Sequence, residues 1–287
     1  MSVPIRDAAT VLALREQGEA VEVFMVRRDS RLGFLGGAHV FPGGAVDEED
    51  RSEEALALLR GLDTLGDASR IHPDPVQARA LLIAAIRELF EEAGILLACT
   101  NDGHGVDLVD GSERASRLLE ARRASSEGRG GFARAVAAED LVLDVSGLRY
   151  FAHWITPDRE RKRFDTRFFL ARAPAGQLAR HCEIESTEGE WMSPARALER
   201  YRARDIELVP PTIATLETLS RFTSVDGALA AFLDTPIPSI LPKITMVEET
   251  FTILYPGDSD YESGQAAQPG GRAVNRLILR DGLWCRP

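Results

Sequence analysis

Apolar and polar residues alternate in several short segments of the chain, which is the pattern of strands with one buried face. Residues 8–26 hold two such segments, A-A-T-V-L-A-L-R and V-E-V-F-M-V, on either side of the turn-prone pair Gln17-Gly18. Similar segments occur at residues 150–156 and 166–173. The pattern therefore predicts a hairpin near the beginning of the sequence and two further strands around a polar loop.

A helical period replaces this alternation after Asp74. Asp74 can cap a helix whose first turn contains Pro75, and Gly94 is a typical stop signal. Between them, apolar residues recur with helical spacing and form one stripe at Leu82, Ile86, Leu89 and Ala93. We therefore expect one long amphipathic helix. Shorter helices are predicted after Ser52 and Ser193, which can cap the turns that follow them, and after the P-P-T segment as far as Phe222.

Two regions look like additions to this arrangement. Residues 101–147 contain two helical pieces around a flexible S-S-E-G-R-G-G stretch, which indicates a helical insertion or cap. From Ile244 onward the alternation returns and suggests an additional hairpin, whereas residues 257–271 are expected to be mobile. We therefore expect a main domain at residues 1–235 and a C-terminal β extension at residues 236–287.

The composition is that of a globular protein in a reducing compartment. The 287 residues are 44% hydrophobic and 28% charged, and no apolar segment approaches the roughly 18 residues that a membrane helix needs. The charged first twenty residues do not resemble a secretory signal, and the three cysteines form no CxxC pair. We therefore expect a cytoplasmic protein without a membrane span, a disulfide framework or a zinc site.

The formal net charge of −11 narrows the range of ligands. It repels polyanions at long range, so nucleic-acid binding is not expected. A small anionic substrate stays compatible with this charge if metal ions and arginines neutralise it locally.

The segment R-E-L-F-E-E-A-G-I at residues 87–95 concentrates negative charge on one helix. Glu88, Glu91 and Glu92 are spaced so that they repel one another and project together opposite the apolar stripe, on an exposed face. Their oxygens suit Mg²⁺ or Mn²⁺, and a spare carboxylate can act as a base in the hydrolysis of a diphosphate. An ordinary solvated acidic face is the alternative interpretation.

Two segments together resemble the two halves of the Nudix box, Gx5EX7REUxEExGU, in which U is apolar. F-P-G-G-A-V-D at residues 41–47 is similar to the first half, and residues 87–95 match every fixed position of the second. The resemblance implies an α/β/α sandwich around a mixed sheet. It also implies metal-dependent hydrolysis, with Mg²⁺ or Mn²⁺, of a nucleoside diphosphate linked to another moiety.

The first half of the box departs from the pattern. Counting from Gly44, Asp50 stands where the family has glutamate, and a much longer segment follows where it has seven residues. A subgroup of Nudix enzymes that resembles the peroxisomal coenzyme A diphosphatases carries an insertion between the two halves of the box. We assign the corresponding insertion in this chain to residues 51–80. That subgroup is also similar to this chain at G-F-L-G-G-A-H-V-F-P-G-G, W-I-T-P, R-F-D-T-R-F-F and W-M-S-P-A-R-A-L.

The resemblance implies roles for the residues of the box. Glu91 and Glu92 would be principal metal ligands, Glu88 a further ligand or the base that activates water, and the backbone at Gly43-Gly44 a participant in the metal site. Arg87 would hold the loop by pairing with an acid. For this pairing three acids stay open: Asp50, which is shorter than the family's glutamate, and Glu53 and Glu54.

Substrate-binding candidates lie outside the helix. Three arginines could grip phosphate or could simply form an exposed strand end, and one glycine begins the G-x-x-x-F-P-G-G segment of the coenzyme A motif. Two glutamates before Trp191 lie where Nudix proteins often supply another carboxylate, although a polar loop is an equally good interpretation. These candidates are Arg27, Arg28, Arg31, Gly37, Glu185 and Glu188.

Coenzyme A or an acyl derivative is the leading substrate that the resemblance implies. The alternatives are ADP-ribose or a dinucleotide such as NADH, a non-catalytic ligand sensor with the same fold, and a structural interaction module. We expect a small nucleotide-type ligand and leave a homodimer open. If the helical insertion covers the cleft, it would select the leaving group.

Overall fold

The computed structural model describes residues 3–31, 33, 35–109, 111–158, 160–247, 249–262 and 274–287. The chain divides into two compact units. The larger unit consists of residues 7–152 and 167–237, and the smaller of Met1–Arg6, His153–Thr166 and Pro238–Pro287. Phe34 of the G-F-L-G-G segment and residues 263–271 of the stretch expected to be mobile lie outside the described residues.

A mixed sheet forms the centre of the larger unit. Its strand order is β11-β3-β2-β1-β9-β8, with β10 paired to β2 and β4 paired to β1. The predicted hairpin is confirmed, since β1 and β2 pair antiparallel. Strands β3 and β11 pair in parallel, so the sheet is mixed. The strands are β1 (Ile5–Gln17), β2 (Ala20–Arg28), β3 (Ala38–Val40), β4 (Gly43–Ala45), β8 (Arg149–Ile155), β9 (Arg163–Arg172), β10 (Ser186–Met192) and β11 (Glu207–Leu208).

Helices cover both faces of this sheet, so the predicted α/β class is confirmed. Phe24 and Val26 of β2 belong to the hydrophobic core that contains α2 (Pro75–Ala93). Because side chains alternate along a strand, the other face of β2 is left for α5 (Pro194–Arg202), which contacts that strand. Two further helices follow, α6 (Pro210–Leu219) and α7 (Val225–Ala231); the sequence analysis did not predict α7.

Helix α2 has the bounds that its local signals predict. The Asp74 side chain accepts a hydrogen bond from the backbone N–H of Val76, Pro75 occupies the first turn, and Gly94 ends the helix at a φ of 69°. A left-handed residue of this kind is most easily a glycine. However, α2 is buried on nearly every side, including Glu92, so the prediction of an exposed acidic face is wrong.

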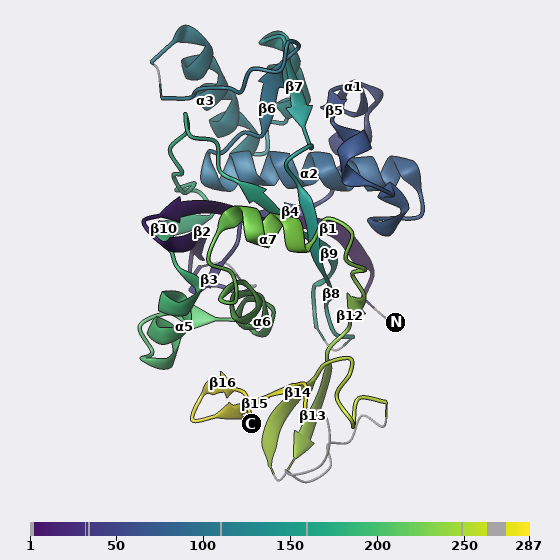
Figure 1. The fold of residues 1–287 in the computed structure, drawn as a ribbon, viewed down its shortest axis with the longest axis vertical. Coiled ribbons are helices and arrows are strands. Elements are labelled where there is room, and N and C mark those ends of the chain that lie inside the picture. Colours follow the sequence, from purple (N-terminus) through teal and green to yellow (C-terminus); the bar gives the residue numbers. More distant parts are fainter. Residues whose placement is uncertain are drawn as a thin grey trace. The chain divides into compact units, whose positions relative to one another are not determined.

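The two inserted regions bury the outer side of α2. Figure 1 shows α2 between the mixed sheet and the elements of both insertions. The box insertion contributes α1 (Glu53–Ala57) and β5 (Leu59–Arg60), which follow the 3₁₀ turn η1 (Glu49–Arg51). The second insertion contributes α3 (Glu113–Ser126) and α4 (Phe132–Ala138).

A small sheet connects the two insertions. Strand β5 pairs in parallel with β7 (Leu141–Asp144), and β7 pairs antiparallel with β6 (Ala98–Thr100). The second helical piece predicted in residues 101–147 corresponds to α4, which ends at Ala138, and β7 begins at Leu141. The short 3₁₀ turns η2 (Leu62–Leu65) and η3 (Ala68–Arg70) complete the box insertion.

The smaller unit contains the C-terminal strands. An antiparallel meander in the order β13-β14-β15-β16 replaces the single hairpin that the alternation suggested. These strands are β13 (Lys243–Val247), β14 (Thr250–Leu254), β15 (Arg276–Arg280) and β16 (Leu283–Cys285), and β12 (Ser239–Ile240) pairs with the end of β8.

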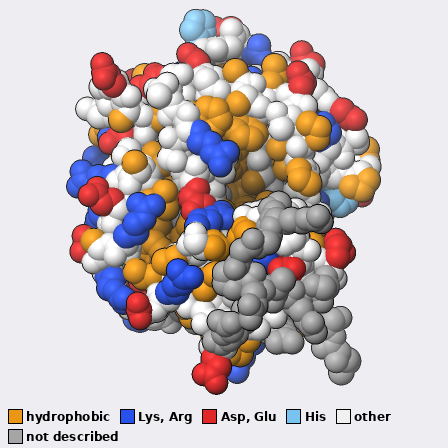
Figure 2. Space-filling model, turned by 60° about the horizontal axis from the view of Figure 1, so that its bottom comes forward, with side chains coloured by type: hydrophobic (Ala, Val, Ile, Leu, Met, Phe, Trp, Pro, Cys, Tyr) orange, Lys and Arg blue, Asp and Glu red, His pale blue; other side chains and the backbone are white. Residues whose placement is uncertain are grey.

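The surface mixes charges of both signs. Figure 2 shows acidic and basic side chains interspersed on one face of the molecule. The net charge of −11 is therefore not gathered into a single acidic field on that face. Among the described residues, no helix combines the length and apolar character that crossing a bilayer requires.

Candidate active site

The three glutamates of the second box half lie in the last two turns of α2. Glu92 is only 6% exposed, and the side chains of Glu88 and Glu91 are each 13% exposed. Carboxylates rarely occupy such positions unless cations or hydrogen bonds compensate for the lost water. Their burial therefore indicates a site built for positive charge.

Strand β4 brings the glycine pair of the first box half against these carboxylates. The backbone N–H of Gly43 donates to Glu92 Oε2 at 3.0 Å. A Cβ built on Gly44 would overlap the Glu88 carboxyl group, 2.7 Å from Oε2, and one on Gly43 would lie 2.7 Å from Thr10 Cα. Gly43 therefore requires glycine, because backbone atoms approach it closely, whereas a side chain at position 44 would displace the Glu88 carboxyl group.

If the chain hydrolyses a diphosphate as the sequence predicts, Gly44→Ala should lower kcat/KM by roughly 10²-fold, because a displacement of about 1 Å at a reacting group can have that effect. The added methyl group would push the Glu88 carboxylate out of position. Gly147→Ala is the matched control, since a Cβ there would meet no atom within 4 Å. Equal activity of the two variants would show that Glu88 does not need its position against β4.

Arg87 links the carboxylates to the first half of the box. Its Nε and Nη2 donate to Oδ1 and Oδ2 of Asp50, both at 2.9 Å, and Nη2 also donates to the Ala45 carbonyl. Its Nη1 donates to Glu88 Oε1 at 2.8 Å and to Glu91 Oε2 at 3.1 Å. One buried guanidinium thereby fixes two of the glutamates and the turn η1.

Asp50 is the acid that pairs with Arg87, a role for which the sequence also left Glu53 and Glu54 open. It is 2% exposed and forms the two-pronged ion pair with Arg87 that suits a planar guanidinium. Glu53 and Glu54 are exposed in the first turn of α1. The shorter side chain reaches Arg87 because η1 packs directly against α2.

The electrostatic state of the glutamates follows from burial. Burial raises the pKa of Glu88 to about 7 against the opposing effect of Arg87. Burial, together with the charge of Glu88, raises the pKa of Glu92 well above its usual range, and burial also raises the pKa of Glu91. Burial therefore disfavours the charged forms of these carboxylates, and a bound cation would stabilise those forms.

The donor chemistry fits a hard divalent ion, although the side chains are not arranged as a finished metal-binding cluster. Among the described residues, no group of three His, Cys, Asp or Glu side chains is set at metal-binding geometry. Carboxylate oxygens are nevertheless the ligands that Mg²⁺ and Mn²⁺ prefer. Glu88 and Glu92 lie close enough together for the charge of Glu88 to raise the pKa of Glu92.

The structure brings two of the predicted substrate-binding residues near this cluster. The charge of Arg28 lowers the pKa of Glu92, and that of Glu185 raises the pKa values of both Glu88 and Glu92. Both effects require proximity, because Coulomb interactions fall with distance. Arg28 and Glu185 therefore lie near the carboxylate cluster.

The other predicted substrate-binding residues lie in different surroundings. Arg27 precedes Arg28 in β2, so its side chain points to the opposite face of the sheet. Its Nη1 lies 3.2 Å from Glu188 Oε1. Arg31 is 83% exposed in its side chain and binds Asp29. Gly37, at a φ of 86°, donates its N–H to the Arg28 carbonyl. The roles of all four in binding substrate remain predictions.

Sequence reasoning missed the second insertion's contribution to the site. The Ser125 hydroxyl of α3 donates to Glu91 Oε1, and Arg122 Nε of the same helix donates to the Glu91 carbonyl at 3.2 Å. No local pattern in the S-R-L-L-E-A-R-R-A-S-S segment marks these residues as partners of a helix that ends before them in the chain.

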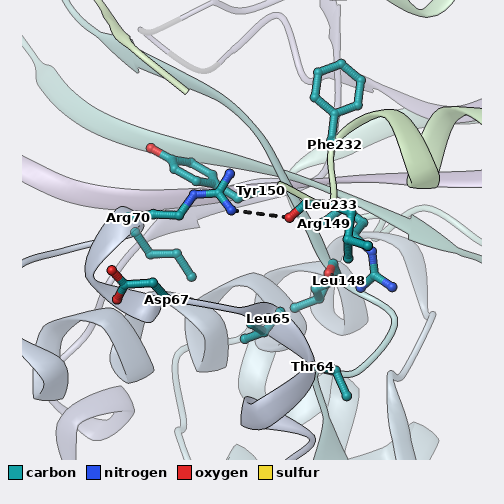
Figure 3. A pocket seen from close by; sticks show the side chains of 10 residues that line it. Thr64, Leu65, Asp67, Arg70, Leu148, Arg149, Tyr150, Phe232 and Leu233 are labelled. Carbon is teal, nitrogen blue, oxygen red and sulfur yellow. Dashed lines mark hydrogen bonds between the residues drawn. The ribbon is translucent and has the colours of Figure 1, made fainter. Parts of the chain in front are cut away.

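A separate pocket lies between the box insertion, the start of β8 and the segment that follows α7 (Figure 3). Arg70 extends across it beside Tyr150 and donates from Nη1 to the Leu233 carbonyl at 3.2 Å. Its lining residues come from these segments and not from α2. The pocket is therefore distinct from the carboxylate cluster.

A mixed sheet with a carboxylate helix packed against a glycine-containing strand, and a buried arginine between them, defines a Nudix hydrolase. A crystal structure of a NUDIX hydrolase from Alicyclobacillus acidocaldarius superposes with a TM-score of 0.64 at 28% identity, over 79% of this chain and 96% of that one. Residues 66–219 match the NUDT19 Nudix domain, and the chain belongs to this family. The resemblance and the class of enzyme expected from the sequence are thereby confirmed.

Two curated relatives cover most of the chain. The chain is 32% identical to the acyl-coenzyme A diphosphatase NUDT19 of Gallus gallus, over 84% of this chain and 72% of the relative. It is 28% identical to the human protein of the same name, over 89% of this chain and 76% of the relative. Nudix hydrolases generally use divalent metal ions, which agrees with the donor chemistry of α2.

Proposed function

We propose that this chain hydrolyses the diphosphate linkage of coenzyme A or an acyl-coenzyme A, with Mg²⁺ or Mn²⁺ as its cofactor. The observation that carries this proposal is the buried cluster of Glu88, Glu91 and Glu92, joined to Gly43 and to the Arg87–Asp50 pair. The names of the curated relatives support the substrate. Water would add to one phosphorus as the bridging P–O bond breaks, giving a phosphopantetheine and an adenosine bisphosphate.

Each side chain of the cluster has a separate task in this proposal. A divalent ion held by Glu91 and Glu92 would neutralise the diphosphate oxygens and make a bound water more acidic. Gly43 N–H fixes the orientation of Glu92, and Arg87 Nη1 fixes Glu88 Oε1 and Glu91 Oε2. Glu88 Oε2, the oxygen that Arg87 does not contact, is the proposed proton acceptor for the attacking water.

The substrate phosphates would bind beside the cluster on the α2 face of the sheet. Arg28 is the proposed cation for this task, because its charge already acts on Glu92. Glu185 is a proposed further carboxylate for the same reason. Arg27 is less suited, since Glu188 occupies its guanidinium on the other face.

The purified chain should cleave coenzyme A or an acyl-coenzyme A in the presence of Mg²⁺ or Mn²⁺, and chelation should stop the reaction. The test compares coenzyme A, acetyl-coenzyme A, ADP-ribose, NADH and diadenosine polyphosphates, with products resolved by chromatography. If only ADP-ribose or NADH is cleaved, the proposed diphosphate hydrolysis would be correct and the proposed coenzyme A substrate would be wrong. Metal binding without cleavage of any compound would favour the sensor, and failure to bind a divalent ion would favour the structural module.

Further properties expected from the sequence complete the proposal. We propose a cytoplasmic protein, a Nudix domain over residues 1–235 with insertions at 51–80 and 101–147, and a C-terminal extension at 236–287. The homodimer left open by the sequence is tested by sedimentation of the full chain.

A further inference from the structure

We propose that the second insertion is a brace for the carboxylate helix, in which Ser125 positions Glu91 and thereby sets the affinity of the site for divalent metal. Ser125 is a positioning residue, because it would act through Glu91, to which its hydroxyl donates. The inference rests on the proposed function in one respect, which is that Glu91 serves a metal-dependent site.

The first observation is that the two oxygens of Glu91 are held from opposite directions. Ser125 donates its hydroxyl hydrogen to Oε1, and Arg87 Nη1 donates to Oε2 at 3.1 Å. A carboxylate held at both oxygens loses little further freedom when it binds an ion, which favours binding. Without Ser125 the carboxylate would be free to turn about the Arg87 contact.

The second observation is that α3 also holds the backbone at the end of α2. Arg122 Nε donates to the Glu91 carbonyl at 3.2 Å, and its Nη2 donates to the Arg180 carbonyl at 2.6 Å. The Arg180 N–H in turn donates to the Ala93 carbonyl at 2.8 Å. A guanidinium at the C-terminal end of a helix satisfies carbonyls that have no partner within the helix and is favoured by the helix dipole.

The third observation places the same insertion beside the other partner of Arg87. The N–H of Gly131, which precedes α4, donates to both oxygens of Glu49 at 3.0 and 3.1 Å. Glu49 belongs to η1 and directly precedes Asp50, the buried acid paired with Arg87. The insertion is therefore attached to both sides of the Arg87 network.

These contacts point to a different role from the one suggested by the sequence, in which the insertion would cover the cleft and select the leaving group. A brace changes metal affinity equally for every substrate. A selective cover changes the order of preference among substrates and leaves metal affinity alone.

The experiment measures Mn²⁺ binding to the full-length protein by the loss of the free-ion EPR signal. Ser125→Ala should bind Mn²⁺ about 10- to 100-fold more weakly, the usual effect of removing a partner that orients a metal ligand. Ser125→Thr keeps the hydroxyl and should restore most of the affinity. Ser116→Ala is the matched control, since the exposed Ser116 on the same helix donates to the Ser112 carbonyl within its own helix and not to α2 in the part of the chain that the structure describes.

A second pair of variants keeps the inference testable if Ser125→Ala does not fold. Glu49→Ala breaks the contact with Gly131 and should also weaken Mn²⁺ binding, whereas Glu48→Ala, on the exposed neighbouring residue, should not. In all variants the order of preference among diphosphate substrates should stay the same.

Wild-type Mn²⁺ affinity in Ser125→Ala, or in Glu49→Ala where it replaces that variant, would overturn the inference, as would a wild-type protein that binds no Mn²⁺. An altered substrate order with unchanged affinity would support the selective cover instead. Because binding is measured without substrate, a wild-type chain that binds Mn²⁺ but cleaves no diphosphate would defeat the proposed function alone.

Discussion

Glu92→Gln should reduce the hydrolysis of the diphosphate substrate by on the order of 10²- to 10⁴-fold, which corresponds to several kcal/mol of lost charge stabilisation in the transition state. The substitution removes a carboxylate from the centre of the cluster. It retains an oxygen that can accept the Gly43 N–H, so β4 should stay in place. The measurement is kcat at saturating substrate across a range of Mg²⁺ and Mn²⁺ concentrations.

The thermal stability of Glu92→Gln should not fall with its activity. Glu92 is 6% exposed, and burial raises its pKa. A neutral amide at this position avoids the cost of a buried charge, so the variant should melt at the same temperature as the wild type or higher in metal-free buffer. Glu54→Gln, on the exposed first turn of α1, is the control and should retain activity. Full activity of Glu92→Gln would place the catalytic site elsewhere.

Asp50→Ala should lower the free energy of unfolding by about 3–5 kcal/mol, the usual cost of leaving one partner of a buried ion pair without the other. Asp50 and Arg87 are 2% and 6% exposed, and the pair is joined by two hydrogen bonds of 2.9 Å. The loss also removes the acceptor for the Asp47 N–H. Since most domains are stable by only about 5–15 kcal/mol, urea unfolding should show a large shift of the midpoint.

Asp47→Ala is the matched control for this prediction. Asp47 lies 3.7 Å from the same guanidinium, but its side chain is 59% exposed. Ion pairs that are open to water contribute about 0–1 kcal/mol, so this variant should unfold close to the wild type. Similar losses in both variants would mean that burial does not govern the Arg87 network.

The parts of the fold that depend on local signals were predictable. Asp74, Pro75 and Gly94 each act within one helical turn, so they predict the bounds of α2 without knowledge of its neighbours. The hairpin of β1 and β2 follows from alternation around Gln17-Gly18 in the same way. Strands of two to four residues, such as β5 and β7, are too short for any period to show.

The burial of the site was not predictable, because it depends on segments that are distant in sequence. Helical spacing places the glutamates away from the apolar stripe, but β4 then packs against Glu88 and Glu92, and α3 contacts Glu91. The distance from Asp50 to Arg87 likewise depends on where η1 packs. The Ser125–Glu91 contact joins residues 34 positions apart, which a single sequence does not reveal.

The three-stranded sheet makes the two insertions one structural unit. Strand β7, from the second insertion, lies between β5, from the first, and β6. Deleting residues 101–147 would remove β7 and leave two short strands with open hydrogen-bonding edges, which favour association between molecules. Each segment therefore depends on the other for its backbone hydrogen bonds, so exchanging one of them between enzymes of this fold would require exchanging both.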